Sequence, residues 1–283
     1  MLMNKEKTLY INIFQIYAQY RNPFTFNYAQ TFPLPPKSTI IGMLQNATGD
    51  YYDDTYNSLK ISIHGTYQDI FWHYQRFIKG DTYLAGGNKL CGEDRKYLYN
   101  FNSKESQRSP KYQQEIFNLN LHLFIRGNEL LEKIYKNLNN PRKILYLGRS
   151  EDVIFIRKVD FITKDSNKNI IDKLFGNGFY LFDGKNEKVS SVLSYNNKLP
   201  VYYCPTTLEF KVKGKNLVEE EKDINKRMGY IFKNKDKIER VPTFKSAYFV
   251  DCSRRLEFND EREFEVFKVG SQEFVISTDF GWA

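Results

Sequence analysis

Apolar and polar residues alternate along several stretches of the N-terminal half, and this spacing predicts β-strands. The segment 9–17 carries β-forming residues on both of its faces, as expected for a strand that is covered on both sides. A period of two, typical of strands with one buried face, recurs further along the chain. Strands are therefore also expected over 59–67, 70–78 and 117–125, and in two runs around Gly148 within 143–162.

Two other segments have the spacing of amphipathic helices. Ile40, Met43, Leu44 and Ala47 recur at i, i+3, i+4 and i+7, which predicts a short helix that ends at Gly49. Pro35 and Pro36 hold the preceding chain extended, so Ser38 is the expected N-cap. A second helix is predicted over 128–138, with Pro141 stopping it.

The order of these elements predicts an α+β fold. It approximates the β-α-β-β-α-β core of a ferredoxin-like or RNA-recognition-type domain. The polar, glycine-spotted stretch at about 80–115 interrupts that core and is interpreted as an insertion. A polar stretch from Thr163 predicts a linker, which gives an N-terminal domain over 1–165 and a small β-rich C-terminal domain over 166–283. The densely charged stretch 211–239 is interpreted as a solvated excursion.

The composition favours a polyanionic partner. Lys and Arg total 42 against 34 Asp and Glu, giving a formal charge of +8, and aromatic residues make up 16% of the chain. This charge fits either nucleic acid binding or a mildly basic surface without a partner, and charge alone weights the two about equally. We expect no membrane association, because no signal peptide and no continuous apolar run of ~18 residues occurs.

The cysteines and histidines exclude several classes of site. The three cysteines, Cys91, Cys204 and Cys252, lie far apart and form no C-x-x-C pair. They indicate a reducing cytoplasm and argue against a disulfide framework or a zinc site. The histidines also lack ligand partners at useful spacing, and a catalytic histidine stays a minority interpretation. His64 and His122 are expected on the polar faces of their strands.

The start of the first predicted helix is a candidate phosphate-binding position. Lys37, Ser38 and Thr39 superficially resemble the end of a nucleotide-binding P-loop, but Pro36 has no N–H to offer a phosphate, so nucleotide hydrolysis is not expected. The helix start still offers N–H groups for one phosphate of a nucleic acid strand, although Ser38 could serve only as a cap. Upstream, Arg21 precedes four possible base-stacking rings. These rings, which could equally belong to the core, are Phe24, Phe26, Tyr28 and Phe32.

Two motifs resemble those of a known family. LPPKSTIIGMLQNATG over Leu34–Gly49 and ILYLGRSED over Ile144–Asp152 are similar to the two signatures of a CRISPR-associated RAMP subunit. This is the subunit that caps the 5′ handle of guide RNA (crRNA) in type I Cascade complexes, the Cas-five family. The resemblance covers the chain well up to about Ile162 and only weakly beyond it.

The resemblance implies a non-catalytic RNA-binding subunit in antiviral defence, with a thumb-like insertion that grips the handle and no required metal or other cofactor. Its implied partners are the crRNA 5′ handle, the Cascade backbone-filament subunit and large subunit, and target DNA indirectly through the complex. In this reading basic residues and backbone N–H groups position the phosphates and rings stack the bases. The residues expected to contact RNA are Arg21, Lys37, Ser38, Thr39, Lys89, Arg108, Arg142, Lys143 and Arg149.

Two other functions stay open. A branch of the same family cuts precursor guide RNA without metal, using a Tyr, a Lys and a His with the last two adjacent. No Lys-His neighbour pair occurs in this sequence, which favours binding without turnover. The second alternative is a generic assembly module whose basic residues contact acidic partner proteins.

Overall fold

Antiparallel β-sheet dominates the computed structural model, which describes residues 7–25, 28–79, 81–83, 98–100, 107–127, 129–174, 178–194, 198–212, 215–216, 238–252 and 254–283. Four strands form one end of a nine-stranded sheet in the order β2-β6-β1-β7, each pair antiparallel. They are β1 (Thr8–Ala18), β2 (Lys60–Thr66), β6 (Gln107–Arg126) and β7 (Phe155–Ile162). The predicted strands at 9–17, 59–67 and 117–125 are therefore confirmed.

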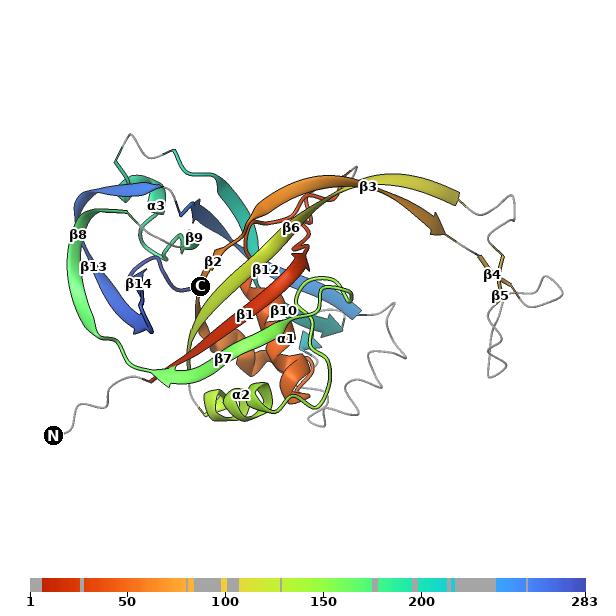
Figure 1. Cartoon of the computed structure of the whole chain (residues 1–283), viewed down its shortest axis with the longest axis horizontal. Coiled ribbons are helices and arrows are strands. Elements are labelled where there is room, and N and C mark those ends of the chain that lie inside the picture. The colour runs from red at the N-terminus through yellow and green to blue at the C-terminus, as the bar shows by residue number, and fades with distance from the viewer. Residues whose placement is uncertain are drawn as a thin grey trace.

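Two helices and a short 3-10 turn follow these strands in the predicted order. They are α1 (Lys37–Thr48), η1 (Asp54–Ser58) and α2 (Leu130–Asn139). Leu9, Ile11 and Ile13 of β1 are buried in the same core as Ile40 and Leu44 of α1, because alternate strand residues point toward the helices. Figure 1 shows α1 and α2 together against the sheet. Of the two predicted β runs around Gly148, only the second forms a strand.

The C-terminal half extends the same sheet beyond β2. Its strands β9 (Gly178–Phe182), β12 (Ile238–Val250), β10 (Val201–Val212) and β11 (Lys215–Asn216) continue in the order β9-β12-β10-β11. The predicted linker after Thr163 is wrong, because β8 (Ser166–Leu174) pairs with β13 (Arg255–Val269). With β14 (Gln272–Ser277), these form a second, three-stranded sheet. The short helix α3 (Val189–Val192) packs beside β13.

A two-stranded arm projects from the large sheet (Figure 1). The first half of β6 pairs with β3 (Asp69–Lys79) along its whole length, and the small pair β4 (Asp81–Tyr83) and β5 (Leu98–Asn100) lies beyond it. The predicted strand at 70–78 is thus the inner part of an arm, at the place where the sequence predicts an excursion from the core. Most of 80–106 and of 217–237 falls outside the described residues.

The second sheet covers part of the face of the large sheet that lies opposite the helices. Phe267 and Phe274 pack there against Tyr10 and Phe124. This packing buries His64 and His122, so the polar strand faces on which the sequence places them are not exposed to solvent. Burial lowers the pKa of His64 to about 3 and that of His122 to about 4, with smaller effects from His122 on His64 and from Arg157 on His122.

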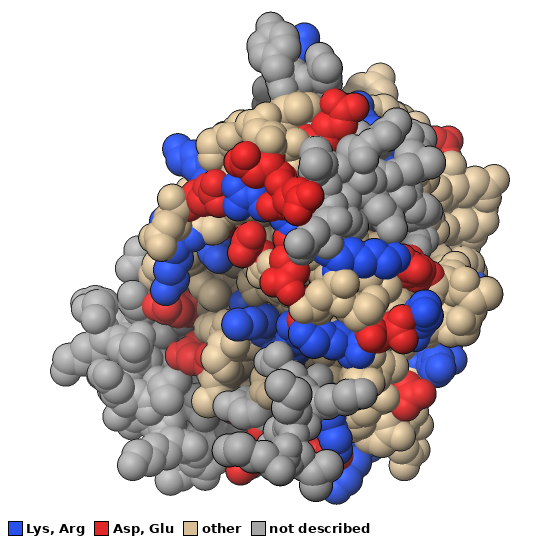
Figure 2. All heavy atoms as spheres, turned by 90° about the vertical axis from the view of Figure 1, so that its left-hand side faces the viewer, with Lys and Arg blue, Asp and Glu red and all other residues tan. Residues whose placement is uncertain are grey.

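The outer surface of this second sheet carries charges of both signs side by side, as Figure 2 shows. Several of them form ion pairs, including Lys168 with Glu273 at 2.7 Å and Lys268 with Asp165 at 2.6 Å. The surplus of basic residues is therefore balanced locally on this end of the molecule.

Candidate functional site

Helix α1 presents one buried face and one open face, and the open face forms the floor of a pocket. Its apolar residues Ile40, Met43 and Leu44 are buried as the spacing predicts. Gly49 ends the helix at a left-handed φ of 82°, donating its N–H to the carbonyl of Gln45 at 2.9 Å. The N-cap is Pro36, not Ser38, and no side chain caps this end, so the hydroxyl of Ser38 faces the pocket instead.

Gly42 lies in the middle of the open face and has no packing reason to be glycine. A Cβ atom built there would meet nothing within 4 Å. Glycine inside a helix costs about 1 kcal/mol of stability relative to alanine. Its missing side chain leaves the helix backbone accessible at the pocket floor.

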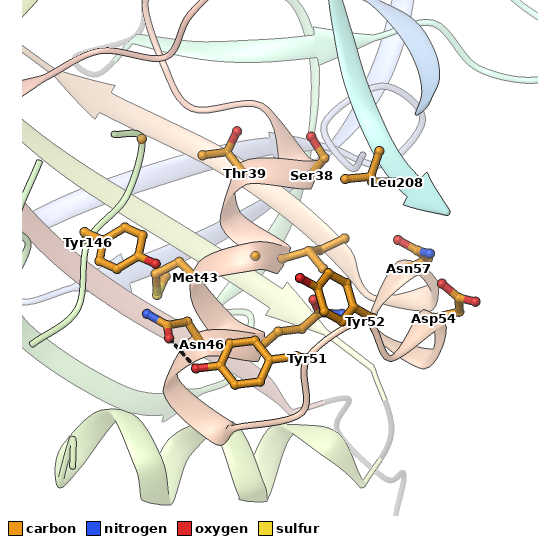
Figure 3. A pocket seen from close by; sticks show the side chains of 14 residues that line it. Ser38, Thr39, Met43, Asn46, Tyr51, Tyr52, Asp54, Asn57, Tyr146 and Leu208 are labelled. Atoms are coloured by element: carbon orange, nitrogen blue, oxygen red, sulfur yellow. Dashed lines mark hydrogen bonds between the residues drawn. The ribbon is translucent and has the colours of Figure 1, made fainter. Parts of the chain in front are cut away.

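The pocket has a cavity volume of about 380 Å³, within the range of sites that hold one small molecule or one nucleotide. Ser38 and Thr39 lie at one end of its floor, while Tyr146 and Tyr52 stand on opposite sides of α1 (Figure 3). Tyr52 has a φ of 61°, an uncommon conformation for a bulky residue. The remaining lining residues are Ile41, Gly42, Met43, Gln45, Asn46, Tyr51, Asp54, Asn57, Gly148 and Leu208.

Asn46 is the most informative residue of this pocket. Only 7% of it is exposed, and its Oδ1 accepts a hydrogen bond of 2.9 Å from the Tyr51 hydroxyl, drawn as a dashed line in Figure 3. Its Nδ2 is buried and has no hydrogen-bond partner within the part of the chain that the structure describes. A buried unsatisfied amide costs about 1–3 kcal/mol. A ligand with an acceptor atom would satisfy it.

The loop that carries Gly148 closes the pocket and is fixed rigidly to the end of β1. Gly148 has a φ of 108°, and a Cβ there would lie 2.7 Å from the Gln19 carbonyl oxygen and 2.8 Å from Oδ2 of Asp152. That same Oδ2 accepts hydrogen bonds from the backbone N–H groups of Gln19 and Arg149, at 3.0 and 2.9 Å. Only glycine fits this close approach of two backbone segments.

Arg149 stabilises this loop through ion pairs of its guanidinium. Its guanidinium forms ion pairs with Asp152 at 2.8 Å and with Glu115 of β6 at 2.5 Å. Burial would lower its pKa, but the hydrogen bonds and charges of Asp152 and Glu115 outweigh it and raise the pKa above its usual value. Both ends of its guanidinium are thus paired within the chain, and the phosphate contact expected of Arg149 stays a prediction.

Lys37 is likewise an internal anchor. It is 6% exposed, and its Nζ donates hydrogen bonds to the carbonyl oxygens of Asn57 and Ala283 at 3.1 and 3.2 Å. Burial, together with the charge of Lys245, lowers its pKa to about 8. Of the three predicted residues at the helix start, only Ser38 and Thr39 line the pocket.

The other predicted contacts are scattered. Arg142 and Lys143 are exposed beside the pocket, whereas Arg21 is exposed at the base of the arm, where its charge contributes to lowering the pKa of Lys111 after the larger effect of burial. Lys89 lies outside the described residues, and of Arg108 only the backbone in β6 is described.

The predicted stacking rings separate into buried and exposed ones. Phe32 belongs to the core, Phe24 packs on Phe244 at 5.3 Å, and Tyr28 on Trp72 at 5.7 Å. Both Phe24 and Tyr28 remain about half exposed, and neither lines the pocket. Phe26 lies outside the described residues.

Sequence reasoning missed Asn46, Tyr51 and Tyr146. Asn46 follows Gly42 by four residues and Thr39 by seven, so helical spacing alone places all three on the open face of α1. That signal was available. The sequence could not show that the amide of Asn46 is unsatisfied, because this depends on which hydrogen-bond partners the folded chain supplies.

Within the described residues no group of three or more His, Cys, Asp or Glu side chains is arranged to hold a metal ion. A search of the described helices likewise finds none long and apolar enough to cross a membrane.

Comparisons with solved structures find a chain of a "CRISPR RNA-guided surveillance complex" with 13% identity and a TM-score of 0.47, covering 89% of this chain and 90% of that chain. A chain of a "Type III-B Cmr-beta" complex bound to cognate target RNA has 14% identity and a TM-score of 0.35, covering 89% and 86%. A "Crystal structure of Cas protein" has 20% identity and a TM-score of 0.33, covering 52% and 58%. No curated protein sequence matches.

The family comparison is more informative because it covers most of the chain. The model described as CRISPR-associated protein (Cas_Cas5) matches residues 8–212, a span that includes α1, the Gly148 loop, the arm and β10. The chain therefore belongs to the Cas5 family of CRISPR-associated proteins.

Proposed function

We propose that this chain is a non-catalytic subunit of a type I Cascade surveillance complex that holds the 5′ handle of the guide RNA. The pocket on α1 receives one base of the handle. The observation that carries this proposal is the buried, unpartnered Nδ2 of Asn46 at the wall of the pocket, a donor placed for an acceptor on a base edge.

The rest of the pocket supports a base as the ligand. Tyr51, Tyr52 and Tyr146 provide rings, Ser38 and Thr39 provide hydroxyl groups, and Gly42 lets a planar ring approach the helix backbone. Single-stranded RNA is recognised in this way, by splayed bases that stack on rings and hydrogen-bond along their edges. In the assembled complex we expect the backbone-filament and large subunits as protein partners, with target DNA reached only through the complex.

The absence of catalysis is part of the proposal. His64 and His122 are buried on the opposite side of the sheet from the pocket, and their lowered pKa values keep them neutral at physiological pH. Incubating the protein with repeat RNA in the absence of metal should leave the RNA intact. A discrete cleavage product would instead assign the chain to the endoribonuclease branch.

The binding test compares a short single-stranded RNA carrying the repeat-derived 5′ sequence with a scrambled RNA of equal length. The substitution Asn46→Asp keeps an oxygen for Tyr51 but replaces the free donor with an acceptor. We expect about 10-fold weaker binding of the repeat-derived RNA, because one hydrogen bond worth ~0.5–1.5 kcal/mol is lost and the new carboxylate repels the strand.

A matched control is Asn259→Ala on the second sheet, where the side chain is exposed and donates to the Ser191 carbonyl oxygen. It should bind both RNAs as the native chain does. Equal affinity of the native chain for the two RNAs would contradict the proposal and favour a generic assembly module.

A further inference from the structure

The pocket cannot by itself balance the charge of a bound strand. None of the described residues that line it is Lys or Arg, and Asp54 adds a negative charge. Each nucleotide of an RNA strand carries a phosphate, and binding energy for single strands comes largely from neutralising these phosphates. The strand must therefore meet cations immediately beside the pocket.

A second hollow next to the pocket has those cations. It has a cavity volume of about 820 Å³ and lies between the end of α2 and the first half of β7. We call it the β7 groove. Its basic lining residues are Arg142, Lys143, Arg157 and Lys158, and none of its described lining residues is acidic.

Two of these cations, Arg142 and Lys158, are largely available to a ligand. Within the described chain Arg142 has no acidic partner, and Lys158 has only a surface pair with Asp160 at 3.6 Å, in which both side chains are half exposed. Such pairs contribute little to stability and exchange readily. Arg157 lies 4.3 Å from the ring centre of Phe14. Exposed apolar side chains stand among the cations, with Ile144 76% and Phe155 51% exposed.

The groove and the pocket adjoin each other. Lys143 of the groove donates a hydrogen bond to the hydroxyl of Tyr51, which lines the pocket, and lies 4.9 Å from the centre of its ring. Leu145 lines the groove and the adjacent Tyr146 lines the pocket. The chain Lys143–Tyr51–Asn46 thus links the first cation of the groove to the unpartnered amide of the pocket.

The strand at the groove also offers backbone donors. β7 is the last strand of the large sheet in the described chain and pairs only with β1. Its other edge therefore presents N–H groups, which bind phosphate oxygens as well as side chains do.

We propose that the RNA strand whose base enters the pocket continues past Lys143 and lays its phosphates along the β7 groove. This deepens the proposed function and rests on it. The two sites have different roles: the pocket, which has no Lys or Arg among its described lining residues, reads one base, and the basic groove supplies most of the salt-dependent affinity.

The test measures RNA affinity across a series of salt concentrations for the double variant Arg142→Gln/Lys158→Gln. Both residues are exposed and lie outside the pocket lining. Loss of two phosphate contacts should reduce the slope of log K against log salt by ~1.4, which amounts to about 25-fold weaker binding at ~0.1 M salt. The preference for the repeat-derived over the scrambled sequence should not change.

The control variant Lys168→Gln/Lys268→Gln removes the same charge from the second sheet, where both lysines are ion-paired. It should alter the slope by less than half as much as the groove variant. Circular dichroism and thermal melting of both variants establish that they are folded.

Two results would overturn the inference. If the slope is unchanged in the groove variant while Asn46→Asp still weakens binding, the groove does not hold RNA and the proposed function survives. The groove would then be a docking edge for an acidic protein segment. If neither variant changes RNA affinity, both this inference and the proposed function fail.

Discussion

The pocket on α1 and the β7 groove lie side by side but differ in almost every physical property. The pocket is small and uncharged at its floor, and it contains the buried amide of Asn46. The groove is larger, more open and basic, with exposed apolar side chains. Directional hydrogen bonds give sequence preference, whereas phosphate contacts give affinity without it. The difference teaches that a base of an RNA strand can be recognised at one site while the phosphates of the strand are bound at another.

A second contrast lies among the cations themselves. Lys37 and Arg149 stand in the two family motifs, yet the folded chain uses both as internal anchors. Arg142 and Lys143 lie just before the second motif and are exposed. Residues of the two motifs thus line the pocket, and basic residues next to the second motif line the adjoining groove.

The largest expected effect of a single substitution comes from Gly148→Ala, because a Cβ there collides with both the Gln19 carbonyl and the Asp152 carboxylate. The free energy of unfolding should fall by about 3 kcal/mol, and the loop that closes the pocket should shift. Chemical denaturation checks the stability, and RNA binding should weaken for both repeat-derived and scrambled RNA. An unperturbed unfolding curve would show that the loop is not clamped as described.

Acid should destabilise the fold without involving either site. The pKa values of His64 and His122 are lowered to about 3 and about 4, below the value near 6.5 of an unfolded chain. Below pH ~6.5 the unfolded state therefore binds more protons, and stability falls as pH falls, by up to about 1.4 kcal/mol per pH unit for each histidine. Melting curves from pH 7.5 down to pH ~4.5 test this. A flat profile would contradict neutral burial of the two rings.

The variants Lys37→Met and Lys143→Met should distinguish a lysine that stabilises the fold, Lys37, from a lysine that contacts RNA, Lys143. Removing the exposed Lys143 should reduce the salt slope of RNA binding by ~0.7, a loss of about 5-fold at ~0.1 M salt. Removing Lys37 should leave the slope unchanged and lower stability by about 1 kcal/mol, because the carbonyls of Asn57 and Ala283 lose their donor. A reduced salt slope for Lys37→Met together with an unchanged slope for Lys143→Met would instead assign the phosphate contact to the start of α1.

The smallest effect has opposite signs for stability and binding. Gly42→Ala adds a methyl group that meets no other atom, so the helix should gain about 1 kcal/mol. The same methyl group narrows the pocket floor, so binding of the repeat-derived RNA should weaken by several-fold. If the variant is more stable and still binds the repeat-derived RNA as the native chain does, the open face of α1 does not contact the RNA.

Local periodicity predicted much of the fold. The alternation in β6 and the i, i+3, i+4 spacing in α1 depend on neighbours in sequence, and both are found as expected. The second sheet could not be predicted in this way, because β8 pairs with β13 from the far end of the chain. Its packing is also what buries His64 and His122.

The site was predictable only as a region. The segment Leu34–Gly49 does form the pocket floor, but its lysine turns inward and its asparagine becomes the key residue. Whether Arg149 meets a phosphate or Glu115 depends on a strand distant in sequence. Residue type and spacing cannot distinguish these outcomes.

The most direct measurement is to purify the chain from its native host and sequence the RNA that accompanies it. A single strand held by a base-reading pocket and a phosphate-binding groove predicts RNA with a uniform 5′ end derived from the CRISPR repeat. Mixed 5′ ends, or no bound RNA at all, would contradict the central claim.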